Sequence, residues 1–290
     1  MRRTTLGARM FNLITKTFYA GLTGLDLKGA VLDLGHGLIL SSADAKFLEC
    51  TEVLDAPLLS ANSQPSRIGK PRLALVTSQL SIPVSVASSF EGREQLAAFL
   101  VSMLRIFTNP GVDLYIFSEF DLSRFGALKR EDARGAWFGF AQYRRRYFAL
   151  APYYPGSTAP NFNYSLGKWT VAHKLYGSQP AFRLLLDSLD WVQFSPNTAL
   201  SLVSVWGSLE AIFAPGRGRI TRRLSSGVAT YLEQTGQERA DLQKRVKNLY
   251  EKRSKGAHGE QHEVTDAHLL ETVVVARRVL LTMIERERMP

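Results

Sequence analysis

The sequence has a single cysteine, Cys50, among its 290 residues. One cysteine cannot form a disulfide within the chain, and such sparse use is typical of a reducing compartment, so we expect a cytoplasmic protein. The chain also has no uninterrupted run of about 18 apolar residues, which predicts that it does not span a membrane. Near the N-terminus Lys16 interrupts the apolar segment 11–19, so we expect that this segment is not a signal peptide.

Residues with metal-binding chemistry are also few. The five histidines and Cys50 form no cluster with a recognised metal-ligand spacing. His258 and His262 stand four positions apart with Glu260 and Glu263 beside them, but the sequence places no convincing third ligand near them. We therefore expect neither a metal ion nor another cofactor.

Basic residues outnumber acidic ones. The formal net charge is +10 at pH 7, and 45% of the residues are hydrophobic, which is enough for well-packed cores. Residues 178–290 hold 16 Lys and Arg against 13 Asp and Glu, a balance of +3, so residues 1–177 carry the remaining +7. A basic balance favours a polyanionic partner such as RNA.

The first part of the chain mixes helical and strand-like patterns. Segment 6–20 is compatible with a helix, and so is 92–107, which ends before a turn signal around Pro110. A second turn signal, centred on His36 between two glycines, separates two short strands. The predicted strands are 25–33, 38–41, 46–54, 72–86 and 112–120. We predict an α+β domain over residues 1–177.

From residue 178 onward the pattern is helical. Apolar residues recur at helical spacing in 181–192, 198–213, 220–232, 237–252 and 265–286. Ser195 is expected to cap the second of these helices, with Pro196 in its first turn. Short loops between helices are typical of a bundle. We therefore predict an all-α helical-bundle domain over residues 178–290.

The segment 250–259, with the sequence YEKRSKGAHG, is where residue chemistry points to a reaction. Arg253 offers a permanent charge and a planar fork of donors that fits a phosphate. His258, five positions later, has the side chain whose proton affinity lies nearest neutral pH. Together they suit metal-free RNA cleavage. The histidine would take a proton from a ribose 2′-hydroxyl or give one to the leaving 5′-oxygen, while the arginine holds the phosphate as its charge grows.

The residues around this segment resemble the HEPN superfamily of helical-bundle domains, many of which are ribonucleases with an Arg-x4-6-His motif. Arg253 and His258 match the motif, and Ser254 fills the polar position that follows the arginine. Glu210, in the apolar helix that contains Trp206, matches an acidic residue often found on an earlier helix. The resemblance covers the helical part of the chain.

This resemblance implies a HEPN-like bundle that acts as a metal-independent endoribonuclease and dimerises with its motifs facing one another. Arg253 would bind the scissile phosphate, His258 would be the acid/base, Ser254 would support them by hydrogen bonding, and Glu210 would orient Arg253. Many such chains are bacterial toxins or antiphage effectors. Beside the arginine, Lys252 and Lys255 are expected to contact the RNA.

Helical geometry sets a condition on the motif. Five residues at about 100° each place Arg253 and His258 roughly 140° apart around an unbroken helix, too far for both side chains to hold one phosphate easily. Either Gly256 interrupts or bends the helix, or a second subunit completes the site. The apolar residues along one face of 265–286 either contact such a second subunit or pack within the bundle. A purely structural interpretation also stays open, with the arginine on a solvated face and the histidine near a helix C-terminus.

Segment 134–154 interleaves aromatic residues with Arg144, Arg145 and Arg146. Such a strip can bind single-stranded RNA, because aromatic faces stack on unpaired bases and arginines hold phosphates. The pattern favours the alternative, in which two half-buried strands turn their aromatic residues inward and the arginines lie at a solvated turn. The three arginines are nevertheless candidate RNA-binding residues.

Two other functional interpretations remain. A non-catalytic HEPN-like module would bind RNA or protein without cutting, and Gly256-Ala257 favours it, because relatives commonly have aliphatic residues just before the histidine. In the second interpretation, the bundle pairs with a partner of nucleotidyltransferase type, as some HEPN proteins do. No segment of this chain resembles the catalytic strand of such an enzyme. In each case the first domain is expected to sense a trigger or select the RNA.

Overall fold

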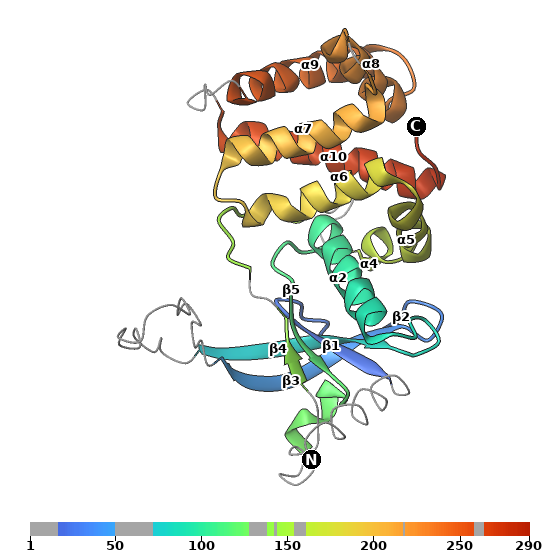
Figure 1. Cartoon of the computed structure of the whole chain (residues 1–290), viewed down its shortest axis with the longest axis vertical. Helices are drawn as coiled ribbons and strands as arrows, with labels where there is room; N and C mark the ends of the chain where they lie inside the picture. The colour runs from blue at the N-terminus through green and yellow to red at the C-terminus, as the bar shows by residue number, and fades with distance from the viewer. Residues whose placement is uncertain are drawn as a thin grey trace, which may run out of the picture. The chain divides into compact units, whose positions relative to one another are not determined.

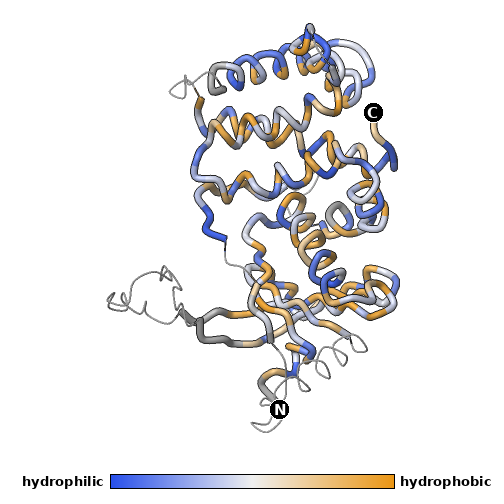
Figure 2. Tube along the Cα trace, viewed as in Figure 1, coloured by the Kyte–Doolittle hydropathy of each residue, from blue (hydrophilic) through white to orange (hydrophobic). Residues whose placement is uncertain are grey.

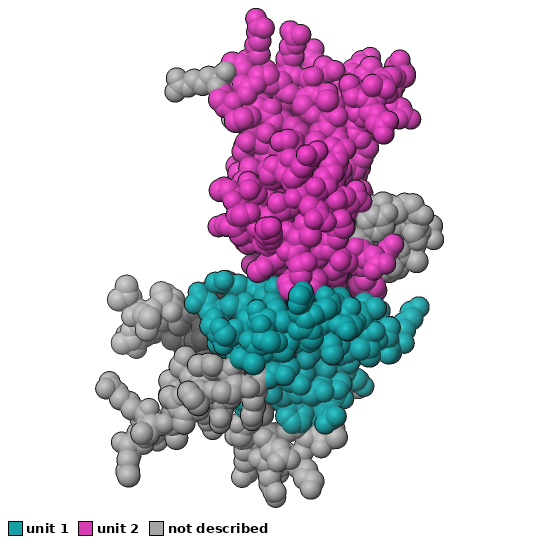
Figure 3. Space-filling model, turned by 90° about the vertical axis from the view of Figure 1, so that its right-hand side faces the viewer, with its two compact units in different colours: residues 1–98, 111–142 teal, residues 99–110, 143–290 magenta. Residues whose placement is uncertain are grey.

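The computed structural model of the chain describes residues 17–49, 72–127, 138–141, 144–153, 161–216, 218–257 and 264–290. It divides into two compact units, coloured separately in Figure 3. Residues 1–98 and 111–142 form the first unit, and residues 99–110 and 143–290 form the second. The second unit therefore begins well before the predicted boundary between residues 177 and 178.

The described part of the first unit holds a six-stranded sheet in which every pairing is antiparallel (Figure 1). The strands are β1 (Phe18–Thr23), β2 (Val31–Asp33), β3 (Ile39–Glu49), β4 (Arg72–Ile82), β5 (Asp113–Ser118) and β6 (Phe138–Phe140). They lie in the order β2-β3-β4-β1-β5-β6. Helix α2 (Phe90–Phe107) contributes residues to both units, and η1 (Leu122–Ala127) is a short 3₁₀ helix. The predicted α+β class of the N-terminal part is confirmed.

Strand β1 corrects the last part of the helix predicted over residues 6–20, where residues 18–20 are in a strand. Its residues Phe18, Ala20 and Leu22 are buried, and it pairs with β4 on one side and β5 on the other. Both partners lie more than fifty residues away in sequence. Local periodicity cannot reveal such pairing, and here the sheet contacts override it. Residues 6–16 lie outside the described part of the chain.

Strand β3 spans parts of two segments, 38–41 and 46–54, that were predicted as separate strands. It stays paired with β4 across an irregularity between Ser42 and Ala45. The turn before it is confirmed, with His36 at a positive φ of 57° between two glycines. The strands predicted at 72–86 and 112–120 and the helix predicted at 92–107 are present with shifted ends, whereas β2 covers only the last part of 25–33.

The described part of the second unit is built from helices (Figure 1). They are α4 (Phe162–Ser165), α5 (Trp169–Ser178), α6 (Pro180–Trp191), α7 (Thr198–Phe213), α8 (Ile220–Leu232), α9 (Gln237–Ala257) and α10 (Asp266–Arg286), with the 3₁₀ helix η2 (Val192–Phe194) after α6. All five helices expected after residue 178 are present, so the predicted helical C-terminal part is confirmed. Helices α4 and α5 precede them, and α5 packs against α6 and α10. This packing explains why the unit begins before residue 178.

The N-terminal cap of α7 differs from the prediction, although the helix begins at the predicted residue. Its N-cap is Asn197, whose side-chain oxygen accepts a hydrogen bond from the backbone N–H of Leu200 at 3.1 Å. Ser195 therefore does not cap the helix, and Pro196 stands before the helix instead of in its first turn. Asparagine is as effective an N-cap as serine, so the residue adjacent to the first turn takes the role.

Helix α7 is the centre of the second unit. It packs against α6, α8, α9 and α10, and its side chains Leu202, Val205, Trp206 and Leu209 are buried. Figure 2 shows α7 as mostly hydrophobic and α9 as mostly hydrophilic. Helix α9 thus lies on the bundle with one face inward and exposes charged residues elsewhere. Among the described residues, no helix is both long enough and apolar enough to cross a membrane.

Candidate active site

The motif arginine contacts the acidic residue predicted to accompany it. Arg253 lies on α9 and Glu210 on α7, and these two helices pack together. Nη2 of Arg253 and Oε1 of Glu210 are 2.9 Å apart and form an ion pair, with the side chains 22% and 21% exposed. The two predicted site residues are therefore brought together by the fold, and their roles in catalysis remain predictions.

Tyr250 completes this cluster. It lies one helical turn before Arg253, and its hydroxyl donates a hydrogen bond to the same Oε1 atom of Glu210 at 3.1 Å. The Arg253 guanidinium lies over its ring, 5.4 Å from the centroid. Burial raises the pKa of the Tyr250 hydroxyl, and the negative charge of Glu210 raises it further. The phenol therefore stays protonated at neutral pH and acts as a fixed donor.

Trp206 supports Tyr250 from α7. The two rings meet edge to face with their centroids 5.6 Å apart, and Trp206 is fully buried. Aromatic pairs in this geometry add to the stabilisation from burial. Our sequence interpretation had not assigned Tyr250 to the site. Tyr250 lies three residues before Arg253, so the two side chains are neighbours on one face of the helix. This spacing is the signal that would identify Tyr250 from the sequence.

Arg253 is not an ordinary solvated arginine. Its Nε atom is buried and has no hydrogen-bond partner among the described residues. A buried donor without a partner costs about 1–3 kcal/mol, so an acceptor that reaches this nitrogen would be stabilising. The structure therefore contradicts the interpretation that places Arg253 on a solvated face.

Helix α9 continues through Gly256 and ends at Ala257, one residue before the motif histidine. The first way of correcting the 140° separation, an interruption at Gly256, is therefore not present in the described helix. His258 itself lies outside the described residues, as does the side chain of Lys255. Ser254 is half-buried next to Arg253.

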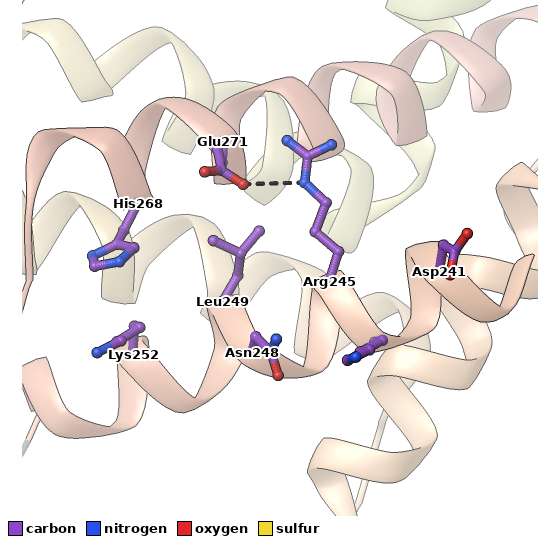
Figure 4. A pocket seen from close by; sticks show the side chains of 8 residues that line it. Asp241, Arg245, Asn248, Leu249, Lys252, His268 and Glu271 are labelled. Carbon is purple, nitrogen blue, oxygen red and sulfur yellow. Dashed lines mark hydrogen bonds and ion pairs between the residues drawn. The ribbon is translucent and has the colours of Figure 1, made fainter. Parts of the chain in front are cut away.

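Lys252 faces a groove between α9 and α10. Figure 4 shows this groove, which has a volume of about 360 Å³ and is lined by charged and polar side chains of both helices. Lys252 was predicted to contact RNA, and its position in a groove is compatible with that role. Neither the groove nor its residues from α10 could be seen in the sequence motif.

The three arginines of segment 134–154 are held by neighbours within the second unit. Arg144 forms an ion pair with Asp190 at 3.6 Å, Arg145 lies over the ring of Tyr147, and Arg146 donates to the Gln193 side chain at 3.2 Å. Residues 144–153 form no strand, which corrects the expectation of two half-buried strands around a turn. Strand β6 is described before them, and residues 128–137 lie outside the described part.

Asp190 also explains why Arg144 is not simply a surface charge. The Asp190 carboxylate accepts two hydrogen bonds from the buried Arg105 at 2.6 and 2.7 Å, and the Arg144 guanidinium lies 5.4 Å from the ring centroid of Trp191. Arg145 and Tyr147 are both exposed. Of the three arginines, Arg145 is therefore the one whose contacts leave it most available to RNA, and the RNA-binding role of all three stays a prediction.

No group of three His, Cys, Asp or Glu side chains in the described ranges is placed to hold a metal ion. His258, Glu260, His262 and Glu263, which were weighed as ligands, lie outside those ranges. Comparisons of the chain with protein-family profiles, with curated proteins and with solved structures find no match. The interpretation of the site therefore depends on its own residues.

Proposed function

We propose that the protein is a metal-independent endoribonuclease of HEPN type that acts as a dimer. Arg253 binds the scissile phosphate, Glu210 and Tyr250 orient Arg253, His258 moves the proton, and Ser254 supports the site by hydrogen bonding. The observation that carries the proposal is the ion pair between Arg253 and Glu210, which holds a partly buried arginine five residues before the motif histidine.

The proposed reaction uses the RNA's own nucleophile. The ribose 2′-oxygen attacks phosphorus as its proton passes to a base, and the P–O bond to the 5′-oxygen breaks as that oxygen receives a proton from an acid. Negative charge grows on the phosphate oxygens during the attack, where the Arg253 guanidinium stabilises it. The products are a 2′,3′-cyclic phosphate and a 5′-hydroxyl, and no electron transfer or metal is required.

A dimer supplies what one chain lacks. Helix α9 is unbroken from Arg253 to Ala257, and an ideal unbroken helix sets residues five positions apart roughly 140° around its axis. Two facing motifs allow Arg253 of each subunit to act with His258 of the other, which gives two composite sites. Leu270 and Val274, four residues apart on α10, are 36% and 39% exposed, and such an apolar pair supports an interface on this helix.

The test of the proposal is RNA cleavage in the presence of excess chelator. The full-length protein should cut single-stranded RNA under these conditions and leave 2′,3′-cyclic phosphate ends, which phosphatase treatment before and after mild acid distinguishes from simple phosphates. Cleavage that stops with chelator and returns with a divalent ion would contradict the mechanism. The wider role, a toxin or antiphage effector whose first unit senses a trigger or selects RNA, is part of the same proposal.

One observation favours a second candidate, the non-catalytic HEPN-like module that binds RNA or protein. The Glu210 carboxylate already neutralises much of the Arg253 charge. An ion pair that only joins α7 to α9 would have the same arrangement. Such a module would bind RNA without cutting it, so the chelator assay combined with a binding measurement separates the two candidates.

A further inference from the structure

Two exposed aromatic rings and two exposed arginines lie around the end of α6. Trp191 is the last residue of that helix, and Tyr147 belongs to the segment 144–153, which passes the end of α6 in Figure 1. The two rings are 52% and 51% exposed, and Arg144 and Arg145 are exposed beside them. Large rings gain stability from burial, so two that stay half exposed in one place indicate a binding surface. We call these four residues the platform.

The segment is fixed to the end of α6 through one residue, Gln193. The backbone N–H groups of Tyr147 and Phe148 both donate to the Gln193 carbonyl oxygen, at 2.9 and 3.3 Å. The Gln193 side chain is buried and accepts a hydrogen bond from Nε of Arg146 at 3.2 Å. These bonds hold the backbone beside Tyr147 in place before any ligand arrives. A surface that is already ordered loses less conformational entropy on binding.

Each exposed ring of the platform has a guanidinium over it. The Arg144 guanidinium lies 5.4 Å from the ring centroid of Trp191, and the Arg145 guanidinium lies 5.0 Å from that of Tyr147. Arg144 also lies 5.6 Å from the ring centroid of the buried Phe194. A planar guanidinium held over a ring keeps its N–H groups at the edge, where they can donate to phosphate oxygens.

The two arginines keep positive charge available to a ligand. Among the residues that the structure describes, Arg145 takes part in no ion pair. Arg144 lies 3.6 Å from the Asp190 carboxylate, but that carboxylate already accepts two hydrogen bonds from Arg105, at 2.6 and 2.7 Å. The platform therefore presents one guanidinium without an acidic partner in the described ranges and a second that shares its acidic partner.

The other carboxylate in this part of α6 has partners of its own. Asp187 accepts a hydrogen bond from the Tyr176 hydroxyl at 3.0 Å. Burial raises the pKa of Asp187, whereas the charge of Arg183, one helical turn earlier, lowers it. Arg183 thus accompanies Asp187, and the charge of Arg145 stays available.

This combination of groups fits single-stranded RNA. An unpaired base has a flat face that stacks on an indole or phenol ring, and the phosphates between successive bases suit guanidinium groups. A duplex keeps those faces stacked inside its helix and offers mainly its backbone and grooves. Trp, Tyr and Arg also occupy the centres of protein interfaces, but the available charge of Arg145 favours a polyanion over such a partner.

We infer that Arg144, Arg145, Tyr147 and Trp191 form a platform on which unpaired bases of the RNA substrate stack. The inference rests on the proposed function, since it takes RNA as the substrate. Trp191 and Tyr147 each receive a base, and the two arginines hold the adjoining phosphates. Arg146 instead fixes the segment at Gln193. The platform binds RNA, and the chemistry stays at the motif on α9.

The binding test uses full-length protein with His258→Ala and a short single-stranded oligonucleotide with 2′-O-methyl riboses, so that no cleavage interferes. Trp191→Ala should weaken binding about tenfold to a hundredfold, the usual effect of losing one base–aromatic stack. Trp191→Phe keeps a ring and should retain most of the affinity. The matched control is Leu184→Ala, because Leu184 lies two turns earlier on the same side of α6 and is 47% exposed. Equal affinities of Trp191→Ala and Leu184→Ala would overturn the inference.

Arg145→Gln tests the charge of the platform in the same binding assay. It should weaken binding and lower the slope of log affinity against log salt by about 0.7, because one phosphate contact on a single strand is lost. The control is Lys174→Gln, which removes an exposed positive charge from α5 in the same unit and should leave the slope unchanged. If the two variants have the same slope, Arg145 does not contact the bound strand and the inference is wrong.

An abasic strand of the same length tests the stacking without any change to the platform, so the folding of a platform variant does not affect the result. It keeps the phosphates and lacks the bases. It should bind about tenfold more weakly or worse than the strand with bases, and Trp191→Ala should then cost little further affinity. An abasic strand that binds as tightly as the complete one would contradict stacking on the platform.

The outcomes also separate this inference from the proposed function. If wild-type protein cuts RNA in chelator while the platform variants bind and cut as before, the platform falls and the ribonuclease stands. If the protein never cuts RNA but Trp191→Ala loses RNA binding, the platform stands and the catalytic proposal falls. If Trp191→Ala and Tyr147→Ala lower self-association in light scattering and leave RNA affinity unchanged, the surface is a protein contact and the inference is overturned.

Discussion

His258→Ala should lower the rate of RNA cleavage on the order of a hundredfold or more, the usual size of the contribution of a general acid–base group. The substitution removes the group that moves the proton and leaves Arg253 and its ion pair in place. The measurement is the single-turnover rate on a labelled single-stranded RNA in chelator. Circular dichroism and thermal melting of the same samples show whether the fold is kept.

The matched control is His262→Ala, which removes the other histidine of the same segment. It should keep the wild-type rate, because no role in proton transfer is assigned to it. A His258→Ala variant that cuts at the full rate would make His258 structural and would leave the non-catalytic module as the better interpretation.

Arg253→Ala should reduce the cleavage rate about a hundredfold to a thousandfold, as expected when a donor that stabilises the charged transition state is lost. Arg253→Lys keeps the charge but loses the planar fork and the contact geometry with Glu210, so we expect it to recover only part of the rate. The rates are measured at saturating RNA, so that weaker binding does not account for the loss.

Arg278→Ala is the control for stability. Arg278 pairs with Glu233 at 2.6 Å, and the Glu233 side chain is 21% exposed, as is that of Glu210. Its removal also leaves a mostly buried carboxylate without its cation, but away from the motif. If Arg278→Ala reduces cleavage as much as Arg253→Ala does, the loss reflects a weakened bundle and gives no support to a catalytic Arg253.

The helices were largely predictable because their signals are local. Helices α7 and α8 have the bounds that their apolar period and the flanking prolines and glycines predicted. Strand β1 was not predictable in this way, since its partners β4 and β5 lie far along the chain and its apolar residues also fit a helical period. Two units were predicted, but the boundary between them was placed later than in the structure, for a related reason. Whether α5 belongs with the sheet or with α6 depends on packing that no single segment encodes.

The candidate site shows the same limit. Arg253 and Glu210 were identified by the motif, and the fold brings them into contact, whereas Tyr250 was present in the motif but was not recognised as part of the cluster. The groove requires two helices in register. Lys244 and Lys252 can be placed on one face of a helix from the sequence alone, but His268 reaches that face only because α10 packs against α9.

The most direct test of the central claim, that Arg253 and His258 act on one phosphate in a site shared by two subunits, is to mix two inactive variants. Arg253→Ala and His258→Ala proteins are each assayed alone and after subunit exchange, in chelator and on the same RNA. In a shared site, half of the dimers are mixed and each has one intact pair, so the account predicts recovery to about a quarter of the wild-type activity. A mixture that stays as inactive as its two components, although exchange is demonstrated by light scattering of differently tagged chains, would contradict the shared site.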